Sequence, residues 1–334
     1  MGQMGFFDIL KRYAGLDAKS DPRVEATWRR PPEARKFKAG RKPWDAVVVF
    51  KALVLCKLYN LSGEQFEYRV RYRLSFMRFL GLGLEDPVPD VTTVWLYREQ
   101  LVQGGVVDEL FGVFDAYLKG QGWLAMCGQV IDASIVPVPN QRNGRDENAA
   151  IKAGETPDDW ADKPAKTRRK DTDACWTKKH GTSHYEYENH VNVDRRHKLI
   201  RRYKVSNATV NDSQVIDDVL DDDNTASGVW ADSAYRLAEI EERLEERSLK
   251  SRIHRKGRRN CPLTQREQQC TKTRPKVRAR LEHVFGAQAN DMGGAMVRSI
   301  GITRGKARTG LKNLAYNMRC AVQPDGLAAA RGPT

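Results

Sequence analysis

Over much of the first third of the chain, hydrophobic side chains recur at the three- and four-residue spacing of helices. The segment WDAVVVFKALVLCKLYN, which starts at Trp44, is apolar at this spacing and predicts a buried helix. Ser62 and Gln65 form a capping-box pattern before a second helix, and Asp90 can cap a later one. The segment VVDELFGVFDAYLKG supplies a further amphipathic helix. These signals predict a small all-helical domain over residues 45–122.

Two further features of this region bear on its role. Ser75 is placed to cap a short helix in the segment FMRFLGL. A Pro-Asp turn then precedes a helix on which Arg98 is expected to be exposed. This arrangement is compatible with a DNA-binding helix-turn-helix and equally with generic helical packing.

From about residue 126 the pattern takes the two-residue period of strands. The run CGQVIDASIV is rich in β-branched residues and is typical of a buried strand. Residues 184–194 and 197–206 alternate and predict an antiparallel hairpin. The elements predicted after them are a helix at 211–222, a strand at 228–232, a helix at 234–248, a strand at 249–255 and a helix at 274–290. Strands followed by alternating helices and strands predict an α/β domain with a mixed sheet over residues 123–322.

Three segments lie outside these periodic regions. Residues 1–44 are basic and turn-rich, and they are interpreted as an arm or linker. Residues 139–180 are polar without a clear period, which predicts a surface excursion within the α/β domain. Residues 323–334 are expected to form a disordered tail.

Composition narrows the class of protein. The chain of 334 residues is 40% hydrophobic, which is ample for packed cores. It has no run of 18 apolar residues, and its amino-terminal segment lacks the features of a secretory signal. The six cysteines are scattered without a CxxC pair, which argues against a disulfide framework or a zinc ribbon. We therefore expect a globular, cytoplasmic protein with no membrane partner.

The positive charge is concentrated in one stretch. The formal net charge is +14. Between Ser251 and Cys320, 17 Lys or Arg residues stand against three acidic residues, so this stretch holds the whole surplus. A charged run is most often a solvated surface, but so large a local imbalance favours a polyanionic partner such as nucleic acid.

Two aspartates close short apolar strands. Asp132 follows the apolar residues of CGQVI, and Asp232 ends the strand GVWAD. A lone aspartate at a strand end commonly makes a turn hydrogen bond. Two of them, at the carboxyl ends of strands that can be neighbours, stand where open α/β sheets place ligands.

Glu282 is the third candidate because it is a lone acid in a strongly basic helix. An ordinary ion pair with Arg278, four residues earlier, is the simpler interpretation. Its position at the border of an apolar stripe also lets it face the strand ends. Carboxylates without nitrogen or thiolate partners suit Mg²⁺, or alternatively Mn²⁺, and two such ions would support phosphodiester displacement.

The blocks VIDASIV, VWADSAY and RARLEHVFG resemble those of the DDE transposases of bacterial insertion elements, in particular the insertion-sequence-five group. The resemblance extends over residues 40–320 and includes the helical region and the segment that enters the hairpin. It implies an RNase H-like catalytic domain in which Asp132, Asp232 and Glu282 are the metal-binding catalytic residues. The family's Tyr-x2-Arg-x3-Glu-x6-Lys pattern is kept only at Arg278 and Glu282.

Candidate DNA contacts are basic residues before the hairpin, around Glu282 and further downstream. They are Lys178, Lys179, His180, Arg274, Lys276, Arg278, Lys306, Arg308 and Lys312. The first three can equally be solvated. The last three could replace the missing lysine of the family pattern.

The sequence thus predicts a prokaryotic, nucleoid-associated transposase that hydrolyses a phosphodiester at element ends and transfers the 3′-hydroxyl to target DNA. Its expected partners are the terminal inverted repeats, the target duplex and a second copy of the chain. A nuclease that cuts without strand transfer would share the same ligands. A non-catalytic DNA-binding relic or regulator is the other alternative.

Overall fold

The computed structural model describes residues 44–330, apart from 124–126, 161, 180, 225, 256–263, 266–276 and 278. The chain forms two compact units. In its described part, one unit comprises residues 44–121, 290–294 and 310–330, and the other comprises most of residues 122–289 and 295–309. Each unit is described by itself.

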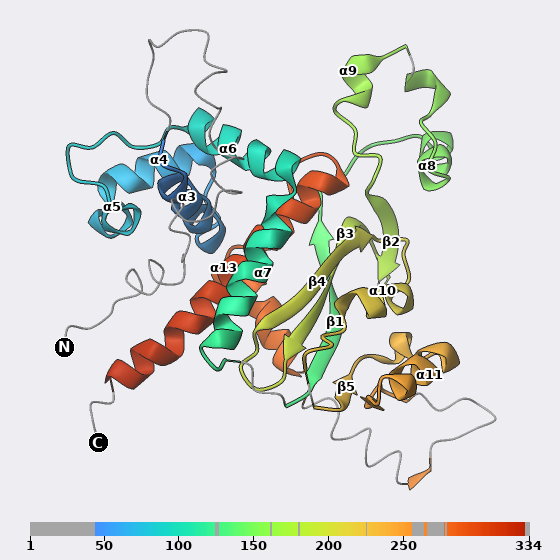
Figure 1. The fold of residues 1–334 in the computed structure, drawn as a ribbon. Helices are drawn as coiled ribbons and strands as arrows, with labels where there is room; N and C mark the ends of the chain where they lie inside the picture. Colours follow the sequence, from blue (N-terminus) through green and yellow to red (C-terminus); the bar gives the residue numbers. More distant parts are fainter. Residues whose placement is uncertain are drawn as a thin grey trace. The chain divides into compact units, whose positions relative to one another are not determined.

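The first unit is built from short helices. They are α3 (Ala46–Leu58), α4 (Gly63–Tyr72), α5 (Leu74–Leu80), α6 (Val91–Gly104) and α7 (Val106–Gly120) (Figure 1). Most of α3 is buried, as its continuous apolar sequence requires. Phe66, Val70 and Leu101 lie wholly inside the core between α3, α4 and α6.

Local capping explains where several of these helices begin. Asp45 accepts a hydrogen bond from the amide of Val47 at 2.8 Å, and Asp90 does the same for Thr93 at 2.7 Å. The predicted capping box at the start of α4 is confirmed, with both hydrogen bonds at 3.1 Å. The prediction for Ser75 is wrong, because α5 starts at Leu74, so Ser75 lies inside the helix and Arg73 holds the cap position.

Residues from the end of the chain complete this unit. Asn60 donates a hydrogen bond to the carbonyl of Gly293 at 2.7 Å. The long helix α13 (Ile302–Ala330) contributes its later turns, so it enters the stretch 323–334 that was predicted to be a tail. Arg98, expected to be exposed, is half-buried in α6. No single helix of the described part is long and apolar enough to cross a membrane, although the bent pair α3 and α4 would pass by length and composition alone.

The second unit is organised around a mixed sheet. Its strands are β1 (Gln129–Pro137), β2 (Cys175–Lys179), β3 (Thr182–Asp194), β4 (Ile200–Asn207), β5 (Gly228–Trp230) and β6 (Lys250–Ser251). The order is β2-β3-β1-β5-β6, and β4 also pairs with β3. The pairs of β3 are antiparallel, whereas β1, β5 and β6 run parallel. The predicted hairpin and the later alternation of helices and strands are confirmed.

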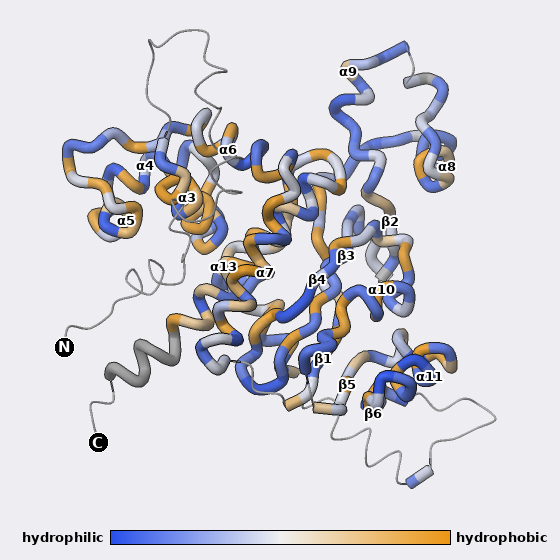
Figure 2. Tube along the Cα trace, viewed as in Figure 1, coloured by the Kyte–Doolittle hydropathy of each residue, from blue (hydrophilic) through white to orange (hydrophobic). Residues whose placement is uncertain are grey.

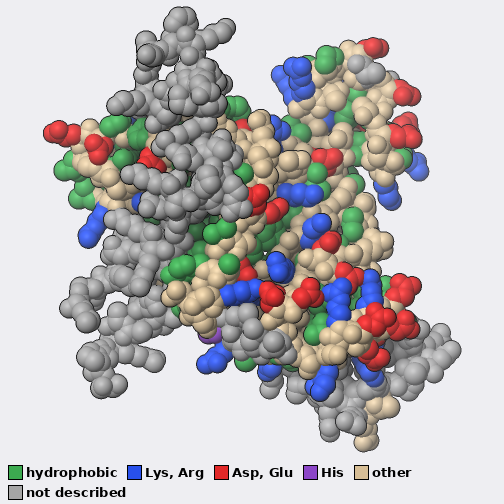
Figure 3. All heavy atoms as spheres, viewed as in Figure 1, with side chains coloured by type: hydrophobic (Ala, Val, Ile, Leu, Met, Phe, Trp, Pro, Cys, Tyr) green, Lys and Arg blue, Asp and Glu red, His purple; other side chains and the backbone are tan. Residues whose placement is uncertain are grey.

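The two faces of the sheet bury different cores. On one face, α10 (Asp212–Val219) and α11 (Ala238–Glu246) cover Ile131, Val229 and Ala231. Ion pairs between Arg243 or Arg247 and acidic residues of the α10 region connect these helices, whose charged side chains intermingle in Figure 3. On the other face, Tyr187 packs with residues that include Val297 and Ile302.

The start of α13 lies close to this second face. A Cβ added at Gly305 would approach the ring of Tyr187 to 3.1 Å, which is tighter than ordinary contact. Glycine at this position therefore permits the helix to come near β3.

The predicted excursion contains more regular structure than its sequence indicated. It includes α8 (Arg145–Lys152), a 3-10 turn at Asp158–Trp160, α9 (Pro164–Thr167) and strand β2. Figure 1 shows α8 and α9 standing out from the sheet, and Figure 2 shows the chain around α9 to be mainly hydrophilic.

One carboxylate organises this excursion. Glu147 accepts hydrogen bonds from the amide of Gly144 and the indole of Trp160, both at 2.7 Å, and from the ammonium group of Lys166. Lys166, Trp160 and Gly144, in that order, lower the pKa of Glu147 to about 2. A charged hydrogen-bonded centre therefore takes the place of a large apolar core here.

Candidate active site

The pairing of β1 with β5 brings Asp132 and Asp232 to neighbouring positions. Val130 pairs with Trp230 in the parallel register, and each aspartate follows two residues later in the sequence. Asp232 lies just beyond the end of β5, as predicted, but Asp132 lies inside β1, so the prediction that it closes its strand is wrong. Because side chains alternate along a strand, Asp132 shares a face with Val130, whereas Asp232 begins the turn that follows β5. Adjacent strands lie about 4.8 Å apart, so the two carboxylates start from adjoining backbone positions.

This face is the one opposite α10. Ile131 and Ala231, which precede the two aspartates, belong to the core beneath α10. Asp132 instead lies opposite Val191 of β3. Asp132 is therefore on the same side of the sheet as Tyr187, which pairs with Val136 further along β1.

Both aspartates are half-buried and held by the backbone that follows them. Asp132 Oδ1 accepts a hydrogen bond from the amide of Ala133 at 3.0 Å. Asp232 Oδ1 accepts from the amide of Ser233 and from its hydroxyl, the latter at 3.1 Å, and caps the 3-10 turn Ser233–Tyr235. These contacts restrain each carboxylate before any ligand binds.

The pKa of Tyr235 is sensitive to the negative charges near this end of the sheet. Its side chain is fully buried. Burial raises its pKa well above the usual range, and the charges of Asp212, Asp132, Glu188 and Asp232 raise it further. Four carboxylates thus act on one phenol. Carboxylate oxygens are the ligands that Mg²⁺ prefers, so Asp132 and Asp232 fit a divalent metal.

Glu282 lies in a helical segment at residues 279–286, which is followed by a π-helical turn at Ala287–Asp291. Leu281 and Val284 are buried, while Glu282 is exposed. Among the described residues, no hydrogen bond or ion pair joins Glu282 to either aspartate.

A chain of contacts does connect this helix with β5. The guanidinium of Arg280 donates to the carbonyl of Arg195. The guanidinium of Arg195 in turn lies 4.7 Å from the ring centre of Trp230. These contacts link the helix of Glu282 to the end of β5, two residues before Asp232.

The candidate DNA contacts differ in exposure. Lys178 and Lys306 are exposed, whereas Arg308 is half-buried. Five candidates lie outside the described residues in whole or in their side chains: Lys179, His180, Arg274, Lys276 and Arg278.

Lys312 does not fit the predicted role of a DNA contact. It is only 8% exposed, and its ammonium group donates to the carbonyls of Met292, at 3.3 Å, and Gly294. Burial lowers its pKa to about 8. Lys312 is therefore not a DNA contact, because its ammonium group is buried and hydrogen-bonded to backbone carbonyls.

A further cluster was not predicted from the sequence. Glu188, His190 and Asp212 each offer a ligand atom, and these atoms lie within 4.8 Å of one another. The two-residue spacing of Glu188 and His190 could have indicated a shared face of β3. Nothing local in the sequence indicates that Asp212, at the start of α10, meets them.

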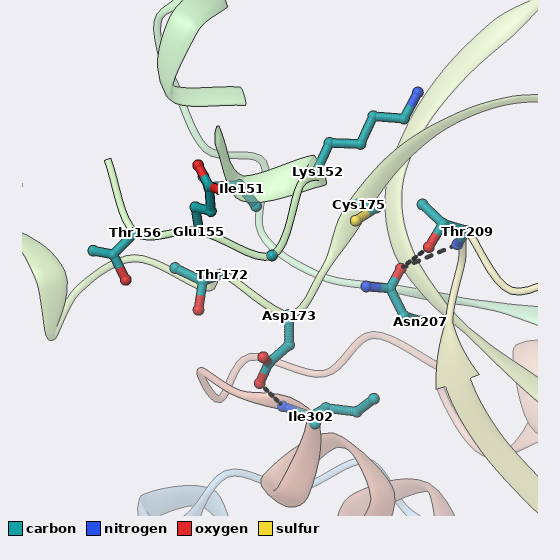
Figure 4. A pocket seen from close by; sticks show the side chains of 11 residues that line it. Ile151, Lys152, Glu155, Thr156, Thr172, Asp173, Cys175, Asn207, Thr209 and Ile302 are labelled. Atoms are coloured by element: carbon teal, nitrogen blue, oxygen red, sulfur yellow. Dashed lines mark hydrogen bonds between the residues drawn. The ribbon is translucent and has the colours of Figure 1, made fainter. Parts of the chain in front are cut away.

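A small cavity of about 260 Å³ lies elsewhere in this unit, where the excursion meets the sheet (Figure 4). Asp173 and Asn207 line it, but their oxygens accept hydrogen bonds from Ile302 and Thr209 respectively. Neither predicted aspartate contributes to its walls, so the cavity is separate from the candidate active site.

The mixed sheet, its flanking helices and the strand order define an α/β protein of the RNase H-like class. Residues 123–318 match the family described as "Transposase DDE domain", and residues 17–100 match "Transposase domain (DUF772)". The chain belongs to the DDE transposase family. Family membership implies use of divalent metal ions and binding of DNA, whereas membership of the insertion-sequence-five group stays a prediction.

Two known proteins are similar to this chain. The transposase for insertion sequence element IS1106 of Neisseria meningitidis serogroup B is 26% identical over 228 residues, which cover 66% of this chain and 75% of that protein. The cryo-EM structure of the piggyBac transposase synaptic complex with hairpin DNA aligns with a TM-score of 0.51 at 9% identity. That alignment covers 98% of this chain and 77% of the other, and it supports the fold.

Proposed function

We propose that this protein cleaves DNA at the ends of an insertion element and transfers the resulting 3′-hydroxyl into target DNA. The observation that supports the proposal is the parallel pairing of Val130 in β1 with Trp230 in β5, each two residues before one of the proposed catalytic aspartates. Glu282 is the third proposed catalytic residue. Its inclusion is supported by the hydrogen bond of Arg280, in the same helix, to Arg195, and by the contact of Arg195 with Trp230 of β5.

The proposed role of these residues is to hold two Mg²⁺ ions, for which Mn²⁺ could substitute. When bound, the ions would activate the attacking oxygen and stabilise the leaving oxygen of the phosphodiester. Ala133 and Ser233 orient the aspartates through their hydrogen bonds. The carboxylate of Glu282 would complete the ligand set from the helix.

The proposed substrate is double-stranded DNA, as the terminal repeats of the element and as the target. The +14 surplus between Ser251 and Cys320 supports it, because cationic side chains gain affinity by displacing counterions from phosphate. Lys178, Lys306 and Arg308 are the proposed contacts with described side chains. Pairing two element ends favours a homodimer on DNA.

A strand-transfer assay tests this proposal. The purified chain is incubated with labelled DNA from the ends of its element, a plasmid target and Mg²⁺. Nicked ends and products joined to the plasmid are both expected. Cleavage without joined products would support a nuclease instead, and binding without cleavage would support a non-catalytic DNA-binding protein.

Glu282→Gln tests the third ligand in the same assay. It should retain DNA binding while losing both cleavage and joining, because it removes a negative charge and keeps the side-chain shape. Glu246→Gln, a change of an acid at the end of α11, is the matched control and should behave as wild type. Full cleavage by Glu282→Gln would remove this residue from the proposed site.

A further inference from the structure

A second group of ligand-bearing side chains lies on the α10 face of the sheet. Glu188 and His190 come from β3, and Asp212 is the first residue of α10. Glu188 Oε2 lies 3.8 Å from His190 Nε2, and Asp212 Oδ1 lies 3.5 Å from His190 Nδ1. We call these three residues the α10-face cluster.

The register separates this cluster from the catalytic aspartates. His190 pairs with Ala133 and Glu188 pairs with Ile135, so both side chains lie on the face opposite that of Asp132. Asp212 begins the helix that covers the same face as His190. The α10-face cluster is therefore a different set of donors from the proposed catalytic site.

The donors are buried and oriented. His190 is fully buried and Glu188 is 6% exposed. His190 Nε2 lies 2.7 Å from the hydroxyl of Ser206 on β4. If Nε2 carries the proton, it donates to Ser206 and leaves Nδ1, on the side of Asp212, as the metal-binding nitrogen. Metal-binding histidines commonly fix their orientation in this way.

Tyr235 supplies an independent observation. Its hydroxyl is buried and has no hydrogen-bond partner among the described residues. Leaving a buried hydroxyl unsatisfied is costly. Tyr235 packs in the same buried core as Val215 and Ile216 of α10, so its hydroxyl lies on the side of the sheet that α10 covers. A ligand with its own water molecules would give that hydroxyl a partner.

We propose that Glu188, His190 and Asp212 bind a divalent transition-metal ion, at a site distinct from that of Asp132 and Asp232. One imidazole and two carboxylates suit Mn²⁺ or Zn²⁺ better than Mg²⁺, which prefers an all-oxygen set. The 3.5 Å between Asp212 Oδ1 and His190 Nδ1 suits two ligands of one ion with bonds of about 2.1 Å. The ion would connect β3 to the start of α10.

Pulsed electron paramagnetic resonance with Mn²⁺ tests this site without measuring activity. The full chain is freed of metal by a chelator and then titrated with Mn²⁺ alone. Nitrogen coupling to bound Mn²⁺ is expected, because the α10-face cluster contains an imidazole and the proposed catalytic set does not. The double variant Asp132→Asn, Asp232→Asn should keep the coupling even if the proposed transposase activity proves wrong.

His190→Gln should abolish the nitrogen coupling, whereas His184→Gln, a change of another histidine on β3, should leave it intact. Asp212→Asn is a gentler variant at a half-buried position, and it should weaken the nitrogen-coupled Mn²⁺ by about 10-fold or more. Circular dichroism checks that each variant is folded. Absence of nitrogen coupling in the wild type, or its persistence in His190→Gln, would overturn the proposal.

Discussion

At the scale of single residues, the role of a charged side chain depends on the groups that surround it. Lys312 and Lys306 lie six residues apart in α13, yet one ammonium group is buried against carbonyls and the other is exposed. Position along a basic sequence therefore does not by itself identify a DNA contact. The hydrogen bonds of Lys312 stabilise the fold, whereas the exposed ammonium group of Lys306 can bind phosphate.

The buried Lys312 predicts a pH dependence of stability. Its pKa is about 8 in the folded chain, below the ordinary value of 10.5. Between these values the unfolded chain binds more protons, so this group makes the free energy of unfolding rise with pH. Urea unfolding at several pH values should show this rise in the wild type and a smaller one in Lys312→Met. Equal pH dependence of the two would contradict the assignment.

At the scale of elements, a close approach of backbone and ring fixes the junction of β1 and β5. Gly128 has a φ of 98°, and a Cβ there would lie 2.8 Å from the carbonyl of Gly228 and collide with the ring of Trp230. The same ring stacks under Arg195. The junction of β1 and β5 thus depends on a residue without a side chain.

Gly128→Ala should therefore destabilise the protein by about 2 kcal/mol or more, from positive-φ strain and overpacking together. Gly122→Ala is the matched control, because Gly122 also has a positive φ of 77° but no atom within 4 Å of the added Cβ. Chemical denaturation measures both. If the two variants lose the same stability, the contact with Trp230 has no role.

The excursion makes a separate prediction about acid. The pKa of Glu147 is lowered to about 2, so its contribution to stability is complete above its ordinary value of 4.5. That contribution should be lost as the pH falls from about 4.5 towards 2. Fluorescence of the buried Trp160 should shift to the red over this range, although other tryptophans contribute to the signal.

Glu147→Gln should produce that shift at neutral pH and expose residues 144–170 to proteolysis. Asp146→Asn changes the exposed neighbour and should leave both fluorescence and proteolysis unchanged. A Glu147→Gln protein as resistant as the wild type would show that the carboxylate does not organise the excursion.

Elements with local signals were predictable from the sequence, and elements that depend on distant partners were not. The starts of α4 and α6 depend on caps within three residues, so Ser62 and Asp90 identified them. Strand β2 carries Lys178 and Lys179 and has no apolar alternation, yet pairing with β3 makes it a strand. The helix predicted at 234–248 begins at Ala238, because Asp232 caps a 3-10 turn before it.

The same distinction applies to the candidate sites. Asp132 and Asp232 could be selected because each follows an apolar run, although the structure places Asp132 inside β1 and Asp232 after the end of β5. The α10-face cluster could not, because it requires the register of β3 and the start of α10. Glu282 could be selected only from the family motif, because no local feature of its helix distinguishes this glutamate from one that forms an ordinary ion pair.

At the scale of the whole molecule, the surplus of positive charge should govern DNA affinity. Lys306→Ala should weaken binding to all duplex sequences alike and reduce the slope of log affinity against log salt by about one. Lys312→Met removes an equal formal charge from a buried position and should leave that slope unchanged. Fluorescence anisotropy over a salt series measures both, and a larger effect of Lys312→Met would reverse the assignment.

The most direct test of the central claim is the rate of Mg²⁺-dependent cleavage of element-end DNA by Asp132→Asn and Asp232→Asn. Each should lose at least about 100-fold in rate while binding DNA as the wild type does, because each loses a carboxylate that holds the metal. Asp218→Asn, at an exposed position of α10, should cleave normally. Wild-type cleavage by either Asp132→Asn or Asp232→Asn would contradict the assignment of the active site to the junction of β1 and β5.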